Sequence, residues 1–393
     1  MKHRTIAIAG CGVAGLACAS LLRARGARVV IYDKLETPKP IGSGLILQPV
    51  GLYVLDEIGV GARMRAMGAP IKRLFGKSGR HVVLDVRYDA LGAHAPHGIG
   101  VHRGALFQVL YEAALEAGAE IVSGREVASV SDGRLAFADG AHAPRFDLVI
   151  DALGARSPLS RAPEAPLPYG ALWASLDWTP EFDPQALEQR YEAARKMVGV
   201  LPIGRMPDGE RQQAAFFWSL KHVDRAGWAA GDLDAWKREV LALWPQTAPL
   251  LNQITRHDDL VFAAYAHRTL REPLSRECVH LGDAWHCTSP QLGQGANMAL
   301  LDAYALAIAL ERQDDLATAL GEYARMRLWH IRLYQLASWA FTPAYQSDDR
   351  FIAWLRDVIV SPLARAPPAP AILAALVAGQ IGAPLHAINK RGA

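Results

Sequence analysis

The sequence is poor in cysteine, nearly balanced in charge and without a long hydrophobic run. Its four cysteines are too few for a disulfide framework in 393 residues, and no two are spaced as CxxC, which argues against a zinc ribbon. A net charge of +3 gives no sign of the concentrated basic face that nucleic-acid binding needs. No apolar run reaches the roughly 18 residues of a transmembrane helix.

Signals for export, for hydrolysis and for metal binding are also missing. The apolar run near the N-terminus is short and glycine-rich and has no cleavage site, so we expect a cytoplasmic protein with reduced thiols. There is no G-x-S-x-G motif and no catalytic triad is expected. His94, His97 and His102 lie in a Gly/Pro-rich stretch without a nearby cysteine, so no metal site is predicted. The composition, 51% apolar and 21% charged, is that of a globular enzyme.

The N-terminus reads as a strand, a glycine-rich turn, a helix and a second strand, at residues 5–9, 10–15, 13–25 and 28–32. In the turn Gly10-x-Gly12-x-x-Gly15, Gly10 permits the tight bend and Gly12 lets a pyrophosphate approach the backbone. Gly15 lets helix and strand pack closely, and the helix N-terminus favours the phosphate charge. Asp33 follows the second strand, where a carboxylate can accept hydrogen bonds from ribose hydroxyls. The pattern predicts a dinucleotide site for FAD or NAD.

A second informative segment follows an apolar strand that is predicted to end at Gly282. Asp283 is then placed at the edge of the sheet, where its carboxylate can bind a polyol. Pro290 begins a glycine-rich loop that enters a helix near Gly295, and the free N–H groups of that helix can stabilise negative charge. Taken alone, the segment also fits an ordinary glycine-rich helix cap, with Asp302 a solvated helix residue.

Further motifs accompany these segments over residues 4–330. The full set is Gly10-x-Gly12-x-x-Gly15, Asp33, Arg103-x-x-Leu106-x-x-x-Leu110, Gly282-Asp283, Ser289-Pro290, Gly293-Gln294-Gly295-x-Asn297, Asp302-Ala303 and Glu322-Tyr323-x-x-x-Arg327. Together they resemble the FAD-dependent aromatic hydroxylases, the group typified by para-hydroxybenzoate hydroxylase and salicylate hydroxylase, although most members carry Glu at the position of Asp33. The resemblance implies that FAD is bound by Gly10, Gly12, Gly15, Asp33, Arg103, Asp283, Gly293, Gly295, Ala296 and Asn297.

One position departs from the family pattern. The family carries an Asp-Gly pair where this chain has Leu153-Gly154, and that Asp is thought to serve both FAD and nicotinamide binding. Asp151 lies two residues earlier on the same face of a strand and is a candidate substitute. Whether NADH or NADPH is the reductant is therefore left open.

The resemblance implies an FAD-dependent monooxygenase that hydroxylates a small aromatic or heteroaromatic substrate. NAD(P)H would reduce the FAD, and a C4a-hydroperoxyflavin formed with O2 would transfer oxygen to the ring. The catalytic candidates are Pro290 in the ring loop, with His222 and Trp218 contacting the substrate; Trp173, Tyr265 and His286 are further candidates. The alternatives are a flavin-dependent oxidase or reductase on the same scaffold, or a non-catalytic FAD-fold binding protein. Absence of a Trp-x-Trp-x-Ile-Pro motif argues against a halogenase.

The motifs predict an α/β architecture with a discontinuous, Rossmann-like FAD-binding domain and an inserted mixed β-sheet substrate domain. The FAD-binding domain is expected to comprise residues 1–70, 99–165 and 275–345. The substrate domain is expected to comprise 71–98 and 168–274, and a C-terminal helical extension 346–393. The expected partners are an aromatic substrate and O2, in a monomer or homodimer.

Overall fold

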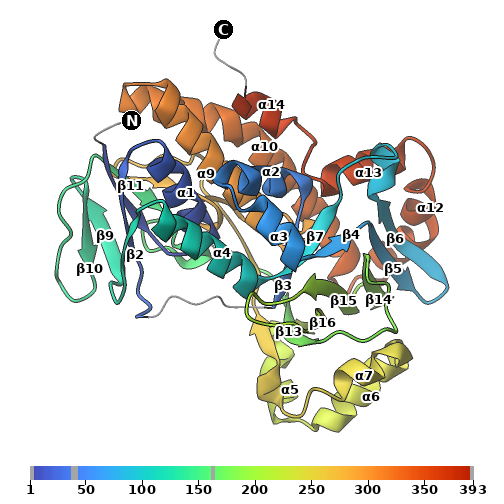
Figure 1. Ribbon diagram of the computed structural model, residues 1–393. Coiled ribbons are helices and arrows are strands. Elements are labelled where there is room, and N and C mark those ends of the chain that lie inside the picture. Colours follow the sequence, from blue (N-terminus) through green and yellow to red (C-terminus); the bar gives the residue numbers. More distant parts are fainter. Residues whose placement is uncertain (1–3, 37–42, 161–163, 390–393) are drawn as a thin grey trace.

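The computed structural model describes residues 4–36, 43–160 and 164–389, and its centre is a parallel sheet (Figure 1). The strand order is β19-β11-β1-β2-β8, with every neighbouring pair parallel. The strands are β1 (Thr5–Ala9), β2 (Arg28–Tyr32), β8 (Glu120–Val122), β11 (Leu148–Asp151) and β19 (Val279–His280). Their continuous apolar runs fit a sheet that is covered on both faces.

Helices cover one face of this sheet and a hairpin covers the other. Ile6 and Ile8 of β1 belong to the same buried cluster as the apolar side chains of α1 (Val13–Ala24), α4 (Arg103–Glu116) and α9 (Gly295–Arg312). Ala7, Ala9 and Tyr32 instead pack with the hairpin of β9 (Val127–Ser131) and β10 (Arg134–Phe137). The hairpin turns at Asp132-Gly133, and both residues adopt positive φ (51° and 72°), as such a turn requires.

A small antiparallel sheet of order β3-β7-β4 connects the parallel sheet to the rest of the molecule. It consists of β3 (Gly44–Leu47), β4 (Ala69–Ile71) and β7 (Gly98–His102). Between β3 and β4 the chain forms α2 (Pro49–Ile58) and α3 (Gly61–Met67). Pro49 at the first position of α2 fits the helix start, where no N–H is needed, and Gly59 ends it in the left-handed conformation.

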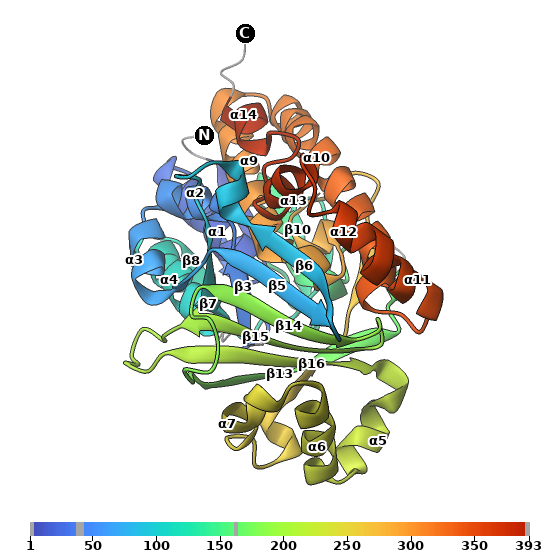
Figure 2. The same ribbon diagram turned by 90° about the vertical axis from the view of Figure 1, so that its right-hand side faces the viewer.

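A seven-stranded mixed sheet of order β17-β13-β16-β15-β14-β5-β6 draws on two distant parts of the chain. Its strands are β5 (Arg73–Ser78), β6 (His81–Arg87), β13 (Tyr169–Asp177), β14 (Ala186–Glu192), β15 (Lys196–Gly204), β16 (Gln213–Lys221) and β17 (Val261–Ala263). The β14–β5 pair is parallel and joins the two parts. Figure 2 shows α5 (Arg225–Ala230), α6 (Leu233–Leu243) and α7 (Ala248–Leu251) below this sheet. A two-stranded ribbon of β12 (Glu164–Pro166) and β18 (Ala266–Thr269) leads back to the parallel sheet.

After α8 (Asp283–His286) and α9 the chain is helical. The helices are α10 (Leu316–Tyr345), α11 (Arg350–Leu355), a π-helical turn (Arg356–Val360), α12 (Ser361–Leu363), α13 (Ala369–Val377) and α14 (Pro384–Asn389). α10 continues past Pro343, which lies inside it, to Tyr345. Contact between the Tyr345 and Tyr191 rings, whose centroids are 5.6 Å apart, holds this last turn in place.

These layers confirm the predicted fold class: an α/β protein with a parallel sheet, a separate mixed sheet and C-terminal helices. In the part of the chain that the structure describes, we find no helix that is long and apolar enough to cross a bilayer. The same residues contain no group of three His, Cys, Asp or Glu side chains arranged to hold a metal ion.

Candidate functional site

A cavity of about 1680 Å³ lies between the parallel sheet, the mixed sheet and the C-terminal helices. Sites for drug-sized ligands measure roughly 300–1,000 Å³, so this one has room for a dinucleotide and a second molecule. Its lining runs from the glycine-rich turn after β1, past the loop before α9, to the aliphatic side chains of β6, β14 and α13.

The glycine-rich turn forms one end of the cavity. Gly12, which precedes α1, has an extended backbone (φ −97°, ψ −173°), and a Cβ built on it would meet nothing within 4 Å. That open space next to a helix N-terminus is where a pyrophosphate fits. Gly10 also lines the cavity, whereas Gly15 does not, because it packs against Gly10: a Cβ on Gly15 would stand 2.0 Å from the Gly10 carbonyl oxygen.

Asp33 stands beside this turn, at the end of β2. Its Oδ2 accepts a hydrogen bond of 2.8 Å from the Cys11 N–H, and its Oδ1 accepts one of 2.9 Å from the Leu35 N–H. The carboxylate therefore fixes the turn while it lines the cavity. Each oxygen retains capacity for a further donor such as a ribose hydroxyl.

Arg103 and Asp283 line the middle of the cavity. Arg103 begins α4, whose preceding residue His102 accepts the Gly104 N–H at Nδ1, 2.9 Å away. Asp283 begins α8 after Gly282, which has a φ of 56°. The Asp283 side chain is open to the cavity but surrounded by protein, and this burial raises its pKa, against the opposing charges of His286 and Arg103. A polyol whose hydroxyls donate to Asp283 would stabilise the carboxylate.

The loop before α9 brings Pro290, Gly293, Gly295 and Ala296 to the cavity. Gly293 adopts the left-handed conformation (φ 61°), and the chain then enters α9 with its first N–H groups free of helical partners. The loop is tied to α10, since the Ser289 hydroxyl lies 2.8 Å from that of Ser338.

Asn297 does not line the cavity, although it was predicted to bind FAD. Its side chain is fully buried. Its Oδ1 accepts the Gln48 N–H at 2.8 Å, and its Nδ2 donates to the carbonyl oxygens of Ile46 and Gly293, 3.1 Å away in each case. Asn297 therefore connects the loop before α9 to the segment between β3 and α2.

A buried ionic cluster lies behind this loop. The Asp302 carboxylate, fully buried, contacts Arg327 Nε at 2.8 Å and His286 Nε2 at 2.6 Å, and accepts the Gly282 N–H at 2.9 Å. Burial alone would raise the pKa of Asp302, but His286 and Arg327 lower it below its ordinary value. His286 is thus engaged with Asp302 and does not line the large cavity. Asp302, which the sequence left as a possible solvated residue, joins α8, α9 and α10.

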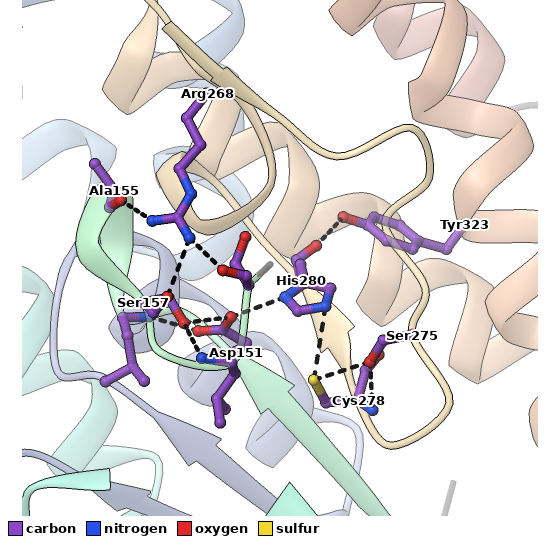
Figure 3. A network of polar contacts seen from close by, with 11 residues as sticks. Asp151, Ala155, Ser157, Arg268, Ser275, Cys278, His280 and Tyr323 are labelled. Carbon is purple, nitrogen blue, oxygen red and sulfur yellow. Dashed lines mark hydrogen bonds and ion pairs between the residues drawn. The ribbon is translucent and has the colours of Figure 1, made fainter. Parts of the chain in front are cut away.

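Figure 3 shows a second polar network at the end of β11. In the sequence it is next to Leu153, the residue that stands where the family pattern has Asp. The Asp151 carboxylate accepts hydrogen bonds from Ser157 Oγ (2.7 Å) and the Leu153 N–H (3.1 Å), and its Oδ2 lies 2.8 Å from His280 Nδ1. Arg268 donates to the carbonyl oxygens of Ala155, Ser157 and Ser160 (Figure 3). Asp151 is fully buried by these partners, whereas Leu153 lines the cavity. Asp151 is therefore not positioned to replace the family's Asp, because its carboxylate does not reach the cavity.

This network gives a pH-dependent prediction for His280. Burial alone would lower its pKa, but hydrogen bonds to Asp151 and Cys278 raise the pKa of His280 to about 9. Because the ordinary value is 6.5, His280 should stabilise the fold fully below pH 6.5, and that contribution should be lost as the pH rises through about 9. We expect the melting temperature of the FAD-loaded protein to fall between these pH values, and to fall less in His280→Gln. An equal fall in both proteins would contradict this role.

Aromatic side chains line the cavity beyond the loop before α9: Trp173 and Phe217 of the mixed sheet, and Tyr265 from the link between β17 and β18. The Trp173 and Phe217 rings are stacked with centroids 4.6 Å apart, and Trp173 Nε1 donates a 3.0 Å hydrogen bond to Tyr265 Oη. Burial raises the pKa of Tyr265 to about 12, against the effects of Trp173 and Arg103, so its hydroxyl is protonated at neutral pH. Trp173 and Tyr265 were among the sequence candidates, and Phe217 was not.

The structure does not bring Trp218 and His222 to the cavity. Trp218 follows Phe217 on β16 and points to the opposite face, where its ring lies 6.4 Å from that of Trp236 in α6. His222 is exposed just after β16, with its ring 5.2 Å from Phe262. Because side chains alternate between the two faces of a strand, the sequence indicates that Phe217 and Trp218 point in opposite directions. It does not say which face of the strand meets α6 and which meets the cavity.

The comparisons with known proteins agree with this geometry. The family described as FAD binding domain matches residues 3–159 and 182–324. An aurachin C monooxygenase/isomerase of Stigmatella aurantiaca is 24% identical over 91% of this chain and 93% of its own length. A 3-amino-4-hydroxybenzoate 2-monooxygenase of Streptomyces cremeus is 29% identical over 82% and 83%. The structure of Klebsiella pneumoniae HpxO with FAD and uric acid superposes with a TM-score of 0.77, at 19% identity over 96% and 97% of the two chains.

Proposed function

This chain belongs to the FAD-binding-domain family, and from that premise we propose that it is a monooxygenase for a hydrophobic aromatic or heteroaromatic ring. FAD would be reduced by NADH or NADPH, and the bound cofactor would supply the oxygen-transfer chemistry. The observation that carries the proposal is the continuity of one cavity. It runs from a built dinucleotide end, at Gly12 and Asp33, to an aromatic end at Trp173, Phe217 and Tyr265.

The residues of the aromatic end have definable roles in this proposal. The stacked faces of Trp173 and Phe217 offer an apolar surface against which a planar ring packs. Tyr265 accepts the Trp173 N–H, which leaves its own proton to donate to an oxygen or nitrogen on the ring. Pro290 and the start of α9 face this region from the cofactor side, and the helix N-terminus there favours negative charge on a bound cofactor.

The cavity beyond the aromatic end suggests that the ring carries an aliphatic substituent. Its lining there is dominated by apolar side chains: Val82, Leu84, Val86, Leu187, Leu201 and Leu373. Asp85 and Arg356, which reach this part, have partners of their own, since Asp85 pairs with Arg73 at 2.7 Å and Arg356 with Asp357 at 2.6 Å. Arg365 has no carboxylate partner among the described residues, but it is exposed at the rim and not buried in the cavity. A buried carboxylate would need an unpaired cation. A neutral ring with an aliphatic chain therefore fits this cavity better than a small aromatic acid of the kind that para-hydroxybenzoate hydroxylase and salicylate hydroxylase are named for.

The proposal is tested by a turnover screen. FAD-loaded protein is mixed with NADH or NADPH under air, and its consumption of reductant is compared across quinolones, phenols and benzoates with and without alkyl chains. We expect alkyl-substituted neutral rings to accelerate consumption and to be recovered with one added oxygen. Reductant consumption that no ring accelerates, or that yields only hydrogen peroxide, would favour an oxidase or reductase instead.

Tyr265→Phe is the matched variant for this screen. It removes one hydroxyl and keeps the ring, so the hydrogen bond from Trp173 Nε1 and the proposed hydrogen bond to the substrate are both lost, and stability should fall by about 1 kcal/mol. We expect kcat/KM for the accelerating compound to fall by about tenfold, as for the loss of one hydrogen bond. FAD affinity should be unchanged. If kcat/KM is the same as in wild type, Tyr265 does not contact the ring.

A further inference from the structure

The C-terminal helices expose large apolar side chains to an unusual degree. Thirteen such side chains are exposed among the described residues, and ten of them fall between residues 329 and 372. The ten are Trp329, Leu336, Trp339, Phe351, Trp354, Val358, Ile359, Val360, Leu363 and Ile372. They lie on α10 to α13, which pass down one side of the molecule (Figure 2). Concentrated exposure of this kind marks an interaction surface.

The exposed residues of α10 form a stripe of arginine and large apolar side chains. Arg325, Trp329, Arg332, Leu336 and Trp339 are all exposed, and their spacings of four, three, four and three residues place them on one helix face. The opposite face of α10 is buried. A solvent-facing stripe would ordinarily be polar, whereas tryptophan and arginine side by side are what the interface of a bilayer favours.

The charge on this surface is positive and uncompensated. Arg325, Arg332, Arg350 and Arg365 are exposed, and within the described ranges none has a carboxylate within 4.0 Å. The exposed carboxylates nearby are engaged: Asp348 pairs with Lys221 at 2.6 Å, and Asp349 caps α11. Such a surface is complementary to anionic lipid headgroups. A symmetric contact with a second copy would instead bring the arginines of both copies together.

The cavity reaches this same surface. Val360, Leu363 and Ile372 line the cavity and are also 47%, 65% and 52% exposed. The aliphatic end of the cavity therefore opens between the side chains of the apolar surface. An amphiphilic molecule could pass from an apolar phase into the cavity here without crossing water.

We propose that α10 to α13 form a peripheral docking surface for an anionic lipid bilayer, with the aliphatic end of the cavity facing the lipid. The tryptophans and leucines would enter the interface, and the arginines would contact the headgroups. Entry of a lipid-dissolved substrate through this opening rests on the proposed function. Binding to the bilayer does not rest on it.

Vesicle binding tests the surface without turnover. FAD-loaded full-length protein is sedimented with vesicles of phosphatidylglycerol and phosphatidylcholine, and with vesicles of phosphatidylcholine alone. We expect binding to the anionic vesicles that weakens with salt. Arg325→Glu/Arg332→Glu should weaken it by roughly tenfold or more, since each basic residue near an anionic surface contributes. Trp329→Ser/Leu336→Ser should weaken it at every salt concentration.

Control variants are available on other parts of the molecule. Arg134→Glu/Arg145→Glu alters exposed arginines by the hairpin of β9 and β10, on the opposite side from α12 and α13 (Figure 1). Leu115→Ser/Val223→Ser alters exposed apolar residues outside the C-terminal helices. Both should bind vesicles like wild type. Equal binding of wild type to neutral and anionic vesicles, equal losses in the controls, or an α10 variant that only converts a dimer to a monomer would overturn the proposal; the last result would identify a second copy as the partner.

Discussion

Gly12→Val is expected to leave the fold in place and to abolish FAD retention. Because the space above Gly12 is open and its φ of −97° is accessible to any residue, valine should cost the apoprotein about 1 kcal/mol or less, as a poorer helix N-cap. In the FAD-loaded protein the same side chain would occupy the space of the pyrophosphate. We expect the Kd for FAD to rise by at least about 100-fold, or about 2.7 kcal/mol, measured by flavin absorbance after gel filtration and by titration of the apoprotein.

Gly15→Ala is the matched control, because it adds a Cβ three residues away in the same turn. There the added atom would stand 2.0 Å from the Gly10 carbonyl oxygen, so α1 and β1 must separate. We expect a loss of stability of about 1–3 kcal/mol in the apoprotein itself. If Gly12→Val retains FAD like wild type, the phosphates do not lie where the turn places them. If the Gly12→Val apoprotein melts at a lower temperature than the Gly15→Ala apoprotein, the space above Gly12 is not open to a side chain.

Adjacent substitutions on β16 should have opposite consequences. Trp218→Ala removes a 3%-exposed side chain that packs against Trp236, and it should cost about 3–5 kcal/mol of stability. Phe217→Leu keeps an apolar side chain but removes the aromatic face stacked on Trp173. We expect it to raise KM for the ring substrate by about tenfold, since aromatic pairs contribute about 0.5–1.5 kcal/mol beyond their burial, with a smaller change in stability.

Thermal unfolding and steady-state kinetics on the two β16 variants separate these effects. In Trp218→Ala the protein that remains folded should keep the wild-type KM. If Trp218→Ala instead raises KM and leaves the melting temperature unchanged, then Trp218, and not Phe217, is on the face of β16 that meets the substrate.

The geometry of the proposed cofactor end was predictable from sequence because its constraints are local. Gly10, Gly12 and Gly15 lie within six residues of one another, and each has a backbone reason to be glycine. Asp33 follows the second strand of the same unit. The pairing of β1 with β2 then brings Asp33 to the Cys11 N–H. Such short-range constraints can be recognised in the sequence without knowledge of the tertiary structure.

The lining of the proposed substrate end was not predictable because it depends on long-range packing. Phe217 and Trp218 are both aromatic residues in one strand, and only the packing of α6 decides which of them is core. Asn297 lies in a motif of the family, but its partner Gln48 comes from a distant part of the chain. Asp302 and Arg327 lie in separate motifs, and only the fold establishes their contact. The exposed stripe on α10 required the structure too, because a buried apolar face would show the same spacing in sequence.

The fate of molecular oxygen distinguishes a monooxygenase from an oxidase or a reductase. FAD-loaded protein, NADH or NADPH and an alkyl-substituted neutral ring are incubated under O2 enriched in the heavy oxygen isotope, and the ring product is analysed by mass spectrometry. A monooxygenase is expected to deliver one labelled oxygen atom into the ring product, with the other released as water. Reductant consumption in which all the label appears as hydrogen peroxide, with the ring unchanged, would show that the protein is not a monooxygenase for that ring.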